Sequence, residues 1–248
     1  MAYVIESGSR AASSGVRLNF LPAALTLSGG AEAEVDWFAP GDFDAVHKMF
    51  SYALEEGNSF PQEGPVDAAG FRAYFLSHDV LVCRVKTKRP SKENESADGA
   101  AGPDGVPLGE MAVVTSTSAE TGAPVGEKAA ESAEMKTTIG AVYIKPNFPG
   151  RCSHICNGGF LVDPLWRRKG VGSALGEYFV RVAPLLGYRA AFFNLVFAQN
   201  TASMRLWEKL GFKKIGLIPR AGRLKGLGFV DAWQYHMEFE GEKEKGDA

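Results

Sequence analysis

The stretch that decides the fold is GFLVDPLWRRKGVGS, which runs from Gly159 to Ser173. It begins as an apolar strand, passes through a short turn and ends in basic residues and glycines that open an amphipathic helix. The start of a helix carries unpaired backbone N–H groups and positive partial charge. The small residues Gly170 and Gly172 allow close approach of the backbone to a ligand. We therefore expect an anion site here, most simply for a phosphate or pyrophosphate.

Two familiar phosphate motifs do not fit this stretch. A dinucleotide fingerprint needs three glycines at a different spacing, and a Walker loop needs a Gly-Lys-Ser/Thr ending. The alternative interpretation is that Gly170 and Gly172 only permit tight packing, while Arg168 and Lys169 form a solvated turn. The position after a strand and before a helix favours anion binding.

The composition of the 248 residues is that of an ordinary soluble globular protein, with 45% hydrophobic and 23% charged residues. A formal net charge of −2 gives no reason to expect nucleic acid as a partner. No apolar run is long enough to cross a bilayer. The N-terminus lacks the layout of a secretory signal, so we expect a cytoplasmic protein, with a mitochondrial or nuclear pool left open. Three cysteines suit a reducing compartment.

One short motif raises the question of a metal. Cys152, His154 and Cys156 alternate, so on a strand they would share one face. No fourth ligand cluster is visible nearby, and cysteine is commonly a small buried hydrophobe. We expect a structural role and no metal.

The apolar patterns predict the order β-α-α-β-β-β-α-β-α-β-β, which is a single α/β domain with a mixed sheet flanked by helices. The almost wholly apolar run at 189–197 is typical of a central strand. Asp42 and Asn200 are expected N-caps. The other predicted strands cover 34–38, 80–85, 138–144, 155–162, 212–217 and 229–239, and the helices begin at 42 or cover 67–77, 170–186 and 200–210.

Three segments fall outside this core. Residues 1–33 are predicted to be an extension that can add an edge strand at 16–21. Residues 86–138 are rich in Ser, Glu, Ala, Gly and Pro, which predicts a disordered surface insertion with partial order at 106–114. Residues 241–248 are predicted to be a charged tail without structure.

The element order, together with the Arg167-x-x-Gly-x-Gly helix start, resembles the GNAT superfamily of acetyl-CoA-dependent N-acetyltransferases. The resemblance covers 34–239 apart from the insertion. It is strongest over 160–212, where Asn200 and the ending LWEKLGF follow in the family's order. It implies a GNAT domain at 34–240, a splayed mixed sheet and acetyl-CoA as co-substrate.

Three short segments resemble a narrower fungal group, which acetylates the ring nitrogen of L-azetidine-2-carboxylate and related proline analogues. They are CNGGF at 156–160, FNLVF at 193–197 and AGRLKG at 221–226. Two asparagines bind substrate in that group, and they map onto Asn157 and Asn194. From the residues alone, each is an amide in an apolar strand, where burial without a partner costs about 1–3 kcal/mol. Either a structural network or a substrate carboxylate or acyl group would satisfy them.

The resemblance also implies a set of contacts to acetyl-CoA. The pyrophosphate would lie on backbone N–H groups of the helix start, and the pantetheine arm would pair with the strand at 160–162. Gly158 and Gly159 would supply a bulge or a close approach there, the alternative being a plain glycine kink. The expected contacts are Phe160, Leu161, Val162, Arg167, Arg168, Lys169, Gly170, Val171, Gly172, Ser173 and Asn200.

The chain departs from the family pattern at Trp207. Many members carry a tyrosine there that protonates the departing thiolate, which an indole cannot do efficiently; water can supply the proton because a free thiol has a pKa near 8.5. No general base is assigned, since a histidine such as His154 at a strand start is more often structural. Arg220, Arg223 and Lys225 lie in a predicted loop, where they either bind a substrate carboxylate or are solvated.

The expected function is therefore N-acetylation of a small amine, an L-proline analogue such as azetidine-2-carboxylate, by direct attack in a ternary complex. Two alternatives stay open: transfer to a protein or peptide amine, and a non-catalytic CoA-binding regulatory module. A chromatin-associated factor of the same fold is disfavoured by the near-neutral charge and the lack of a finger motif. The expected partners are a small-molecule amine, no nucleic acid and no membrane, and a homodimer is compatible with the sequence.

Overall fold

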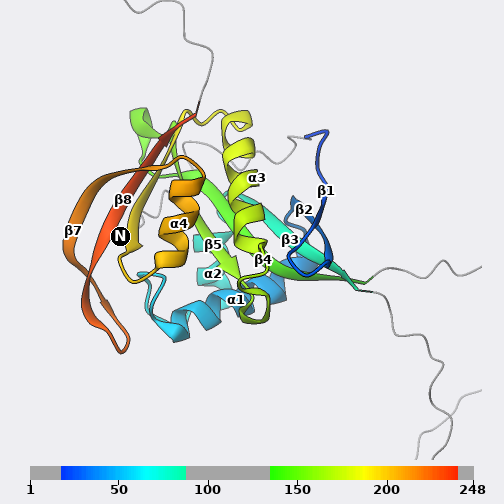
Figure 1. Cartoon of the computed structure of the whole chain (residues 1–248), viewed down its shortest axis with the longest axis horizontal. Coiled ribbons are helices and arrows are strands. Elements are labelled where there is room, and N and C mark those ends of the chain that lie inside the picture. The colour runs from blue at the N-terminus through cyan, green and yellow to red at the C-terminus, as the bar shows by residue number, and fades with distance from the viewer. Residues whose placement is uncertain (1–17, 88–134, 240–248) are drawn as a thin grey trace, which may run out of the picture. The chain divides into compact units, whose positions relative to one another are not determined.

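The computed structural model describes residues 18–87 and 135–239, which build one eight-stranded sheet in the order β1-β2-β3-β4-β5-β6-β8-β7 (Figure 1). The predicted α/β architecture with a mixed sheet is confirmed. Within the described residues, no helix is long and apolar enough to cross a membrane. The strands are β1 (Ala23–Thr26), β2 (Glu32–Trp37), β3 (Asp79–Thr87), β4 (Met135–Pro146), β5 (Ile155–Val162), β6 (Ala190–Phe197), β7 (Lys213–Leu224) and β8 (Gly228–Glu238), and the helices are α1 (Phe43–Glu56), α2 (Ala68–Phe75), α3 (Val171–Leu185) and α4 (Thr201–Lys209).

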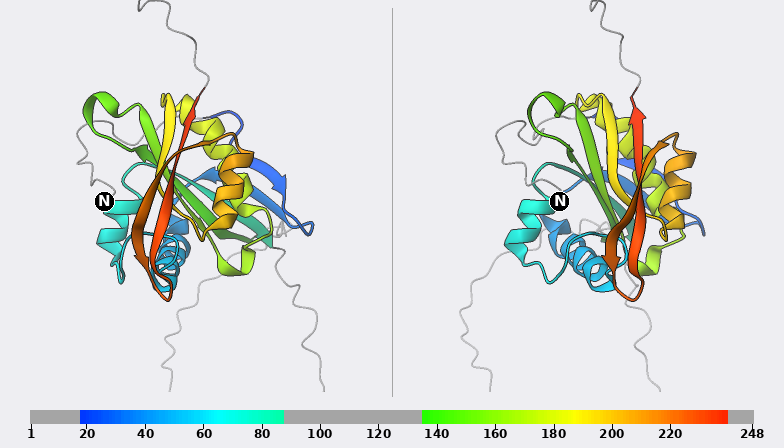
Figure 2. Two further views of the ribbon diagram at one scale, coloured as in Figure 1. Left: turned by 60° about the vertical axis from the view of Figure 1, so that its left-hand side comes forward. Right: turned by 90° about the vertical axis from the view of Figure 1, so that its left-hand side faces the viewer.

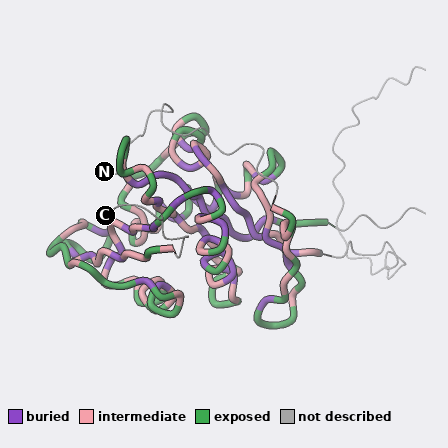
Figure 3. Tube along the Cα trace, turned by 90° about the horizontal axis from the view of Figure 1, so that it is seen from above, coloured by how far each residue is buried: buried purple, intermediate pink, exposed green. Residues whose placement is uncertain are grey.

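The helices cover both faces of the sheet (Figure 2). Helices α1 and α2 pack on one face, where Phe50, Phe71 and Phe75 belong to the same buried cluster as Val82 of β3. Helix α3 and Trp207 of α4 pack on the other face. Burial concentrates along the strands between these layers (Figure 3). Strands β5 and β6 run parallel, as the helical connection through α3 requires.

The edge strand lies elsewhere than at the expected 16–21. Strand β1 at Ala23–Thr26 pairs antiparallel with β2. The two are joined by a turn in which Gly29 and Gly30 have φ values of 97° and 83°, a conformation that glycine adopts without strain.

Residues 1–17, 88–134 and 240–248 lie outside the described residues, and with them most of the predicted insertion, its segment 106–114 and the charged tail. The insertion's predicted borders are too wide, because β3 extends to Thr87 and β4 begins at Met135.

The prediction that Arg220 and Arg223 lie in a loop before the last strand is also wrong, whereas Lys225 does lie in a turn. Strand β7 runs to Leu224 and forms a long hairpin with β8, so Arg220 and Arg223 lie in a strand. Its register shifts between Ile218 and Gly222. An irregular and largely exposed edge strand lacks the regular alternation on which a sequence-based assignment depends.

Asp42 occupies the predicted N-cap position of α1, but its side chain does not cap the helix. It accepts hydrogen bonds from Arg84 at 2.7 and 2.8 Å and from Thr138 at 2.6 Å. Burial opposes its charge, but these hydrogen bonds outweigh burial and lower the pKa of the Asp42 carboxyl. The carboxylate thus ties the start of α1 to β3 and β4.

Candidate active site between strands β5 and β6

Strands β5 and β6 separate after a short paired stretch. The pairs Ile155↔Ala190 and Cys156↔Ala191 are the ones recorded between the two strands in the described part of the chain. Beyond Cys156 the sheet is held together on each side of the gap by β4 and by β8. The predicted splay in the centre of the sheet is therefore present.

Backbone groups of β5 face this gap. The bonds from Asp163 N to Ile139 O (2.9 Å) and from Asn147 N to Ile155 O (2.8 Å) show that odd-numbered residues of β5 bond to β4. Main-chain groups alternate in direction along a strand. Those of Gly158, Phe160 and Val162 are consequently directed toward β6, where the ladder has ended, whereas those of Leu161 are directed toward β4.

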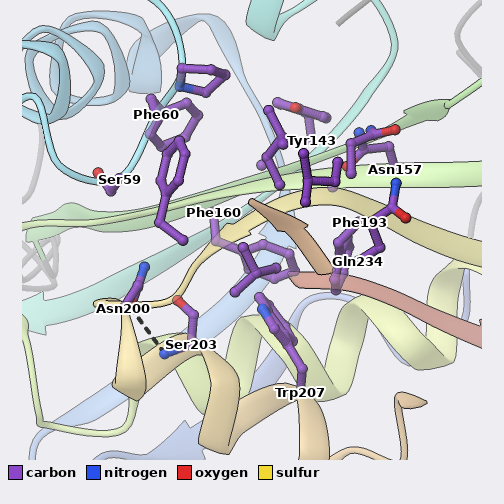
Figure 4. A pocket seen from close by; sticks show the side chains of 18 of the residues that line it. Ser59, Phe60, Tyr143, Asn157, Phe160, Phe193, Asn200, Ser203, Trp207 and Gln234 are labelled. Carbon is purple, nitrogen blue, oxygen red and sulfur yellow. Dashed lines mark hydrogen bonds between the residues drawn. The ribbon is translucent and has the colours of Figure 1, made fainter. Parts of the chain in front are cut away.

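A cavity of about 340 Å³ fills the splay and joins the two faces of the sheet (Figure 4). Ser59, Phe60 and Tyr143 line it on the side of α1 and α2, and Asn200 and Trp207 line it on the side of α4. The other lining residues are Pro61, Tyr74, Asn157, Gly158, Gly159, Phe160, Phe193, Asn194, Leu195, Val196, Phe197, Ser203, Ile218 and Gln234.

The side chains of the two predicted asparagines, Asn157 and Asn194, are joined by the side chain of Asn147, which the sequence analysis did not identify. Asn157 Nδ2 donates to Oδ1 of the buried Asn147 at 3.0 Å, and Asn194 Nδ2 donates to the same oxygen at 2.5 Å. Asn147 Nδ2 donates in turn to Asn194 Oδ1 at 3.2 Å. No hydrogen bond to Asn157 Oδ1 is recorded in the described ranges, and both Asn157 and Asn194 line the cavity. A side-chain amide has two N–H donors and one oxygen acceptor, so the cluster uses only one N–H of Asn157 and one N–H of Asn194. Each of the two residues therefore has a further hydrogen-bond donor for a ligand in the cavity.

A second polar group lies beside this cluster on the same face. Lys145 stands opposite Asn157 in the β4–β5 register. Its Nζ donates to Tyr74 O at 2.9 Å and lies 4.0 and 4.2 Å from the ring centroids of Tyr74 and Tyr143. The two phenol oxygens are 3.1 Å apart. Burial lowers the pKa of the Lys145 ammonium to about 8 and raises the pKa of both phenols.

The glycines of β5 are required by close packing. A Cβ on Gly158 would lie 2.7 Å from the Phe179 ring, and one on Gly159 would collide with the ring of Tyr143. Strand β5 shows no register shift against β4, so neither glycine forms a bulge. They allow aromatic rings to approach the strand from both faces next to the cavity.

The loop before α3 has the geometry of an anion site. Arg168 and Gly170 have φ values of 62° and 91°, and the first intrahelical acceptor is used by Ala174 N, which bonds to Gly170 O at 2.9 Å. The N–H groups from Val171 to Ser173 thus have no helical acceptor. A Cβ on Gly172 would meet only Val162 Cγ2, at 3.8 Å. Packing therefore does not require glycine at this position, which fits close approach by a pyrophosphate.

The basic residues of this loop differ in their surroundings. Arg167 forms a two-pronged ion pair with Glu56 of α1, at 2.7 and 2.5 Å, and this pair braces the loop. Lys169 Nζ lies 4.6 Å from the ring centroid of Trp166. Arg168 is exposed and faces no recorded partner among the described residues.

Helix α4 supplies the wall opposite β5. Asn200 Oδ1 accepts from Ser203 N at 3.1 Å, which confirms the predicted N-cap. Trp207 is buried and packs on Phe160 and Phe193, with ring centroids 4.7 and 4.6 Å away. The cavity thus has an indole at the position where many members of the resembled family have a phenol.

Several other candidate residues lie away from the cavity. Cys152 is exposed in a 3-10 turn, His154 bonds to the Arg151 carbonyl, and Cys156 is buried in β5, so the three do not share one face. Lys225 Nζ donates to Glu55 O at 2.9 Å. Arg220 stacks on Phe229 at 4.8 Å, and Arg223 is exposed in β7.

Comparison with known proteins shows similarity to acetyltransferases. The sequence profile of the acetyltransferase (GNAT) family matches residues 120–212. N-acetyltransferase aca1 of Schizosaccharomyces pombe is 53% identical over 118 residues, which are 47% of this chain and 56% of aca1. Over these residues the chain is similar to the GNAT family. Protein SPT10 of Saccharomyces cerevisiae is 30% identical over 196 residues, which cover 77% of this chain and 30% of SPT10. The chain thus spans about half or less of the length of these relatives.

The GNAT fold extends over most of the chain. The structure of yncA from Salmonella typhimurium, solved with its cofactor acetyl-CoA, superposes with a TM-score of 0.59 at 17% identity. The match covers 87% of this chain and 98% of that protein.

Proposed function

We propose that the chain is an acetyl-CoA-dependent N-acetyltransferase that acts on a small amine, an L-proline analogue such as azetidine-2-carboxylate. The observation that carries the proposal is the cavity that runs through the splay from Trp207 on one face to Asn157 on the other. A thioester arm and an acceptor amine can enter it from opposite faces and meet at the gap. The name of aca1 and the acetyl-CoA of the yncA structure support the same reaction.

The loop before α3 and strand β5 form a surface that fits acetyl-CoA. Acetyl-CoA would supply the activated acetyl group as a thioester. The N–H groups of Arg168 to Ser173 would hold its pyrophosphate, with Arg168 and Lys169 adding charge. Phe160 and Val162 would bond to the amides of the arm as an added strand would. We further propose that Asn200 contacts this arm in addition to capping α4.

The acceptor would occupy the face formed by α1, α2 and β4. Asn157 and Asn194 would orient it so that its nitrogen attacks the thioester carbon directly while the carbon–sulfur bond breaks. The strand N–H groups in the gap would polarise the thioester carbonyl. The described lining residues carry no carboxylate or imidazole, so the chain acts chiefly by positioning, and water takes the amine proton and supplies the thiol proton.

The test is mass-spectrometric detection of N-acetylated product from acetyl-CoA and azetidine-2-carboxylate. Asn157→Ala and Asn194→Ala should each lower kcat/KM for the acceptor by at least about tenfold, because each removes a group that orients the nucleophile. Asn19→Ala, at an exposed position outside the cavity, is the matched control.

Three outcomes would redirect the proposal. Unchanged rates in both asparagine variants would remove the substrate-site assignment. Tight CoA binding without product from a panel of small amines and peptides would favour the non-catalytic module, whereas product from peptides alone would favour a protein N-acetyltransferase.

A further inference from the structure

The acceptor side of the cavity contains a buried positive charge without a counter-ion. Lys145 is 6% exposed, and no ion pair joins it to a carboxylate in residues 18–87 and 135–239. Its recorded polar partner is the Tyr74 carbonyl. A buried charge is normally paired, because desolvation of an isolated ion is costly.

The groups that face Lys145 do not neutralise it. Burial raises the pKa of Tyr74 and of Tyr143, so both phenols are uncharged at neutral pH. Burial lowers the pKa of His78, and the charge of Lys145 lowers it further, so this imidazole is also uncharged. Asn157, opposite Lys145 on β5, is neutral.

The uncompensated charge lies directly behind the cavity wall. Both tyrosines that flank the ammonium line the cavity, and their ring centroids are 4.0 and 4.2 Å from Nζ. Asn157 lines the cavity at the same register position. Because Lys145 is buried, its charge is screened less than a charge in water would be.

We infer that Lys145 selects acceptors that carry an anionic group beside the amine, such as a carboxylate held by the amides of Asn157 and Asn194. This inference rests on the proposed function, and it assigns the acceptor class to the amino acids and their analogues. The charge of Lys145 is neutralised when the carboxylate is bound. The rings of Tyr74 and Tyr143 contact the apolar part of the acceptor.

The direct test removes the negative charge of the acceptor and, separately, the positive charge of Lys145. The kcat/KM for azetidine-2-carboxylate and for its neutral carboxamide is measured with the wild-type protein and with Lys145→Met. The wild-type protein should prefer the carboxylate, and Lys145→Met should reduce that preference by about tenfold or more. The ratio of ratios cancels the different reactivities of the two amines. Lys48→Met, which removes an exposed charge from α1, should leave the preference unchanged.

A second measurement uses only the wild-type protein and is independent of amine ionisation. Cyclobutanecarboxylate has the ring and the carboxylate but no nucleophile, so its inhibition constant reports anion binding. Burial lowers the pKa of the Lys145 ammonium to about 8. Inhibition by cyclobutanecarboxylate should therefore weaken between pH 7 and pH 9.5, because the ammonium loses its proton over this range. In Lys145→Met the inhibition should not change over this range.

The outcomes separate the inference from the proposed function. Equal losses for carboxylate and carboxamide in Lys145→Met, or pH-independent inhibition of the wild-type protein, would overturn the role of Lys145. Absence of product from both acceptors with the wild-type protein would instead overturn the proposed acetylation of small amino acids.

Discussion

At the scale of single residues, Asn147 determines how the two predicted asparagines are held. Its side-chain oxygen accepts from both Asn157 and Asn194, and it is the most buried of the three. Removal of a shared partner leaves two amides without part of their hydrogen bonding, and this cost falls on both folding and substrate orientation.

Asn147→Ala should therefore lower the free energy of unfolding by about 1–3 kcal/mol and should also reduce kcat/KM for the acceptor. Urea unfolding and steady-state kinetics measure the two effects. A variant with lower stability but wild-type kinetics would show that Asn147 does not orient the other two asparagines.

A single glycine offers a test of the pyrophosphate loop. Because a Cβ at Gly172 would meet only Val162 Cγ2 at 3.8 Å, Gly172→Ala should fold normally. The added methyl group would intrude where the pyrophosphate approaches, so the KM for acetyl-CoA should rise by about tenfold or more.

Gly176 one turn later is the matched control. There a Cβ would lie 2.7 Å from Leu210 Cδ1, so Gly176→Ala should lower the thermal unfolding temperature instead. Equal KM values for Gly172→Ala and the wild-type protein would contradict the placement of the pyrophosphate.

At the scale of elements, a buried charge network joins α1 to the sheet. Arg84 of β3 bonds to Asp42 at the start of α1 and also contacts Glu34 and Asp36 of β2. Arg84→Met would leave these carboxylates together without their cation, so we expect a loss of about 3–5 kcal/mol in the free energy of unfolding. Chemical denaturation measures this loss.

Lys136→Met is the matched control for this network. Lys136 also pairs with Glu34, at 2.8 Å, but its side chain is 42% exposed, so its removal should cost at most about 1 kcal/mol. Similar losses in the two variants would contradict the idea that burial makes Arg84 the decisive partner.

The elements differ in how well the sequence predicted them. The strand, loop and helix at 155–186 were predicted nearly to the residue, because apolar periodicity and Gly170 mark their limits. The extent of β7 was missed, because its edge position and register shifts remove the alternation. Asn147 and Lys145 were missed for a different reason: the antiparallel register of β4 and β5 brings them to the site, and no local pattern reports such a register.

At the scale of the whole molecule, the connection between β3 and β4 spans residues 88–134, which lie outside the described residues. The two strands are neighbours in the sheet, and the described residues that line the cavity come from other connections and elements. Replacement of residues 88–134 by a short Gly-Ser linker should leave the kinetic constants unchanged, since a short turn can join adjacent strands. A folded deletion variant without activity would assign the segment a role in the site.

The splay between β5 and β6 is the feature on which the functional account depends. A calorimetric titration of the 248-residue chain with acetyl-CoA tests it most directly, because binding there does not require an acceptor. We predict saturable one-to-one binding with a Kd below about 1 mM, within the usual range of enzyme substrates. Absence of binding at millimolar acetyl-CoA would contradict the account.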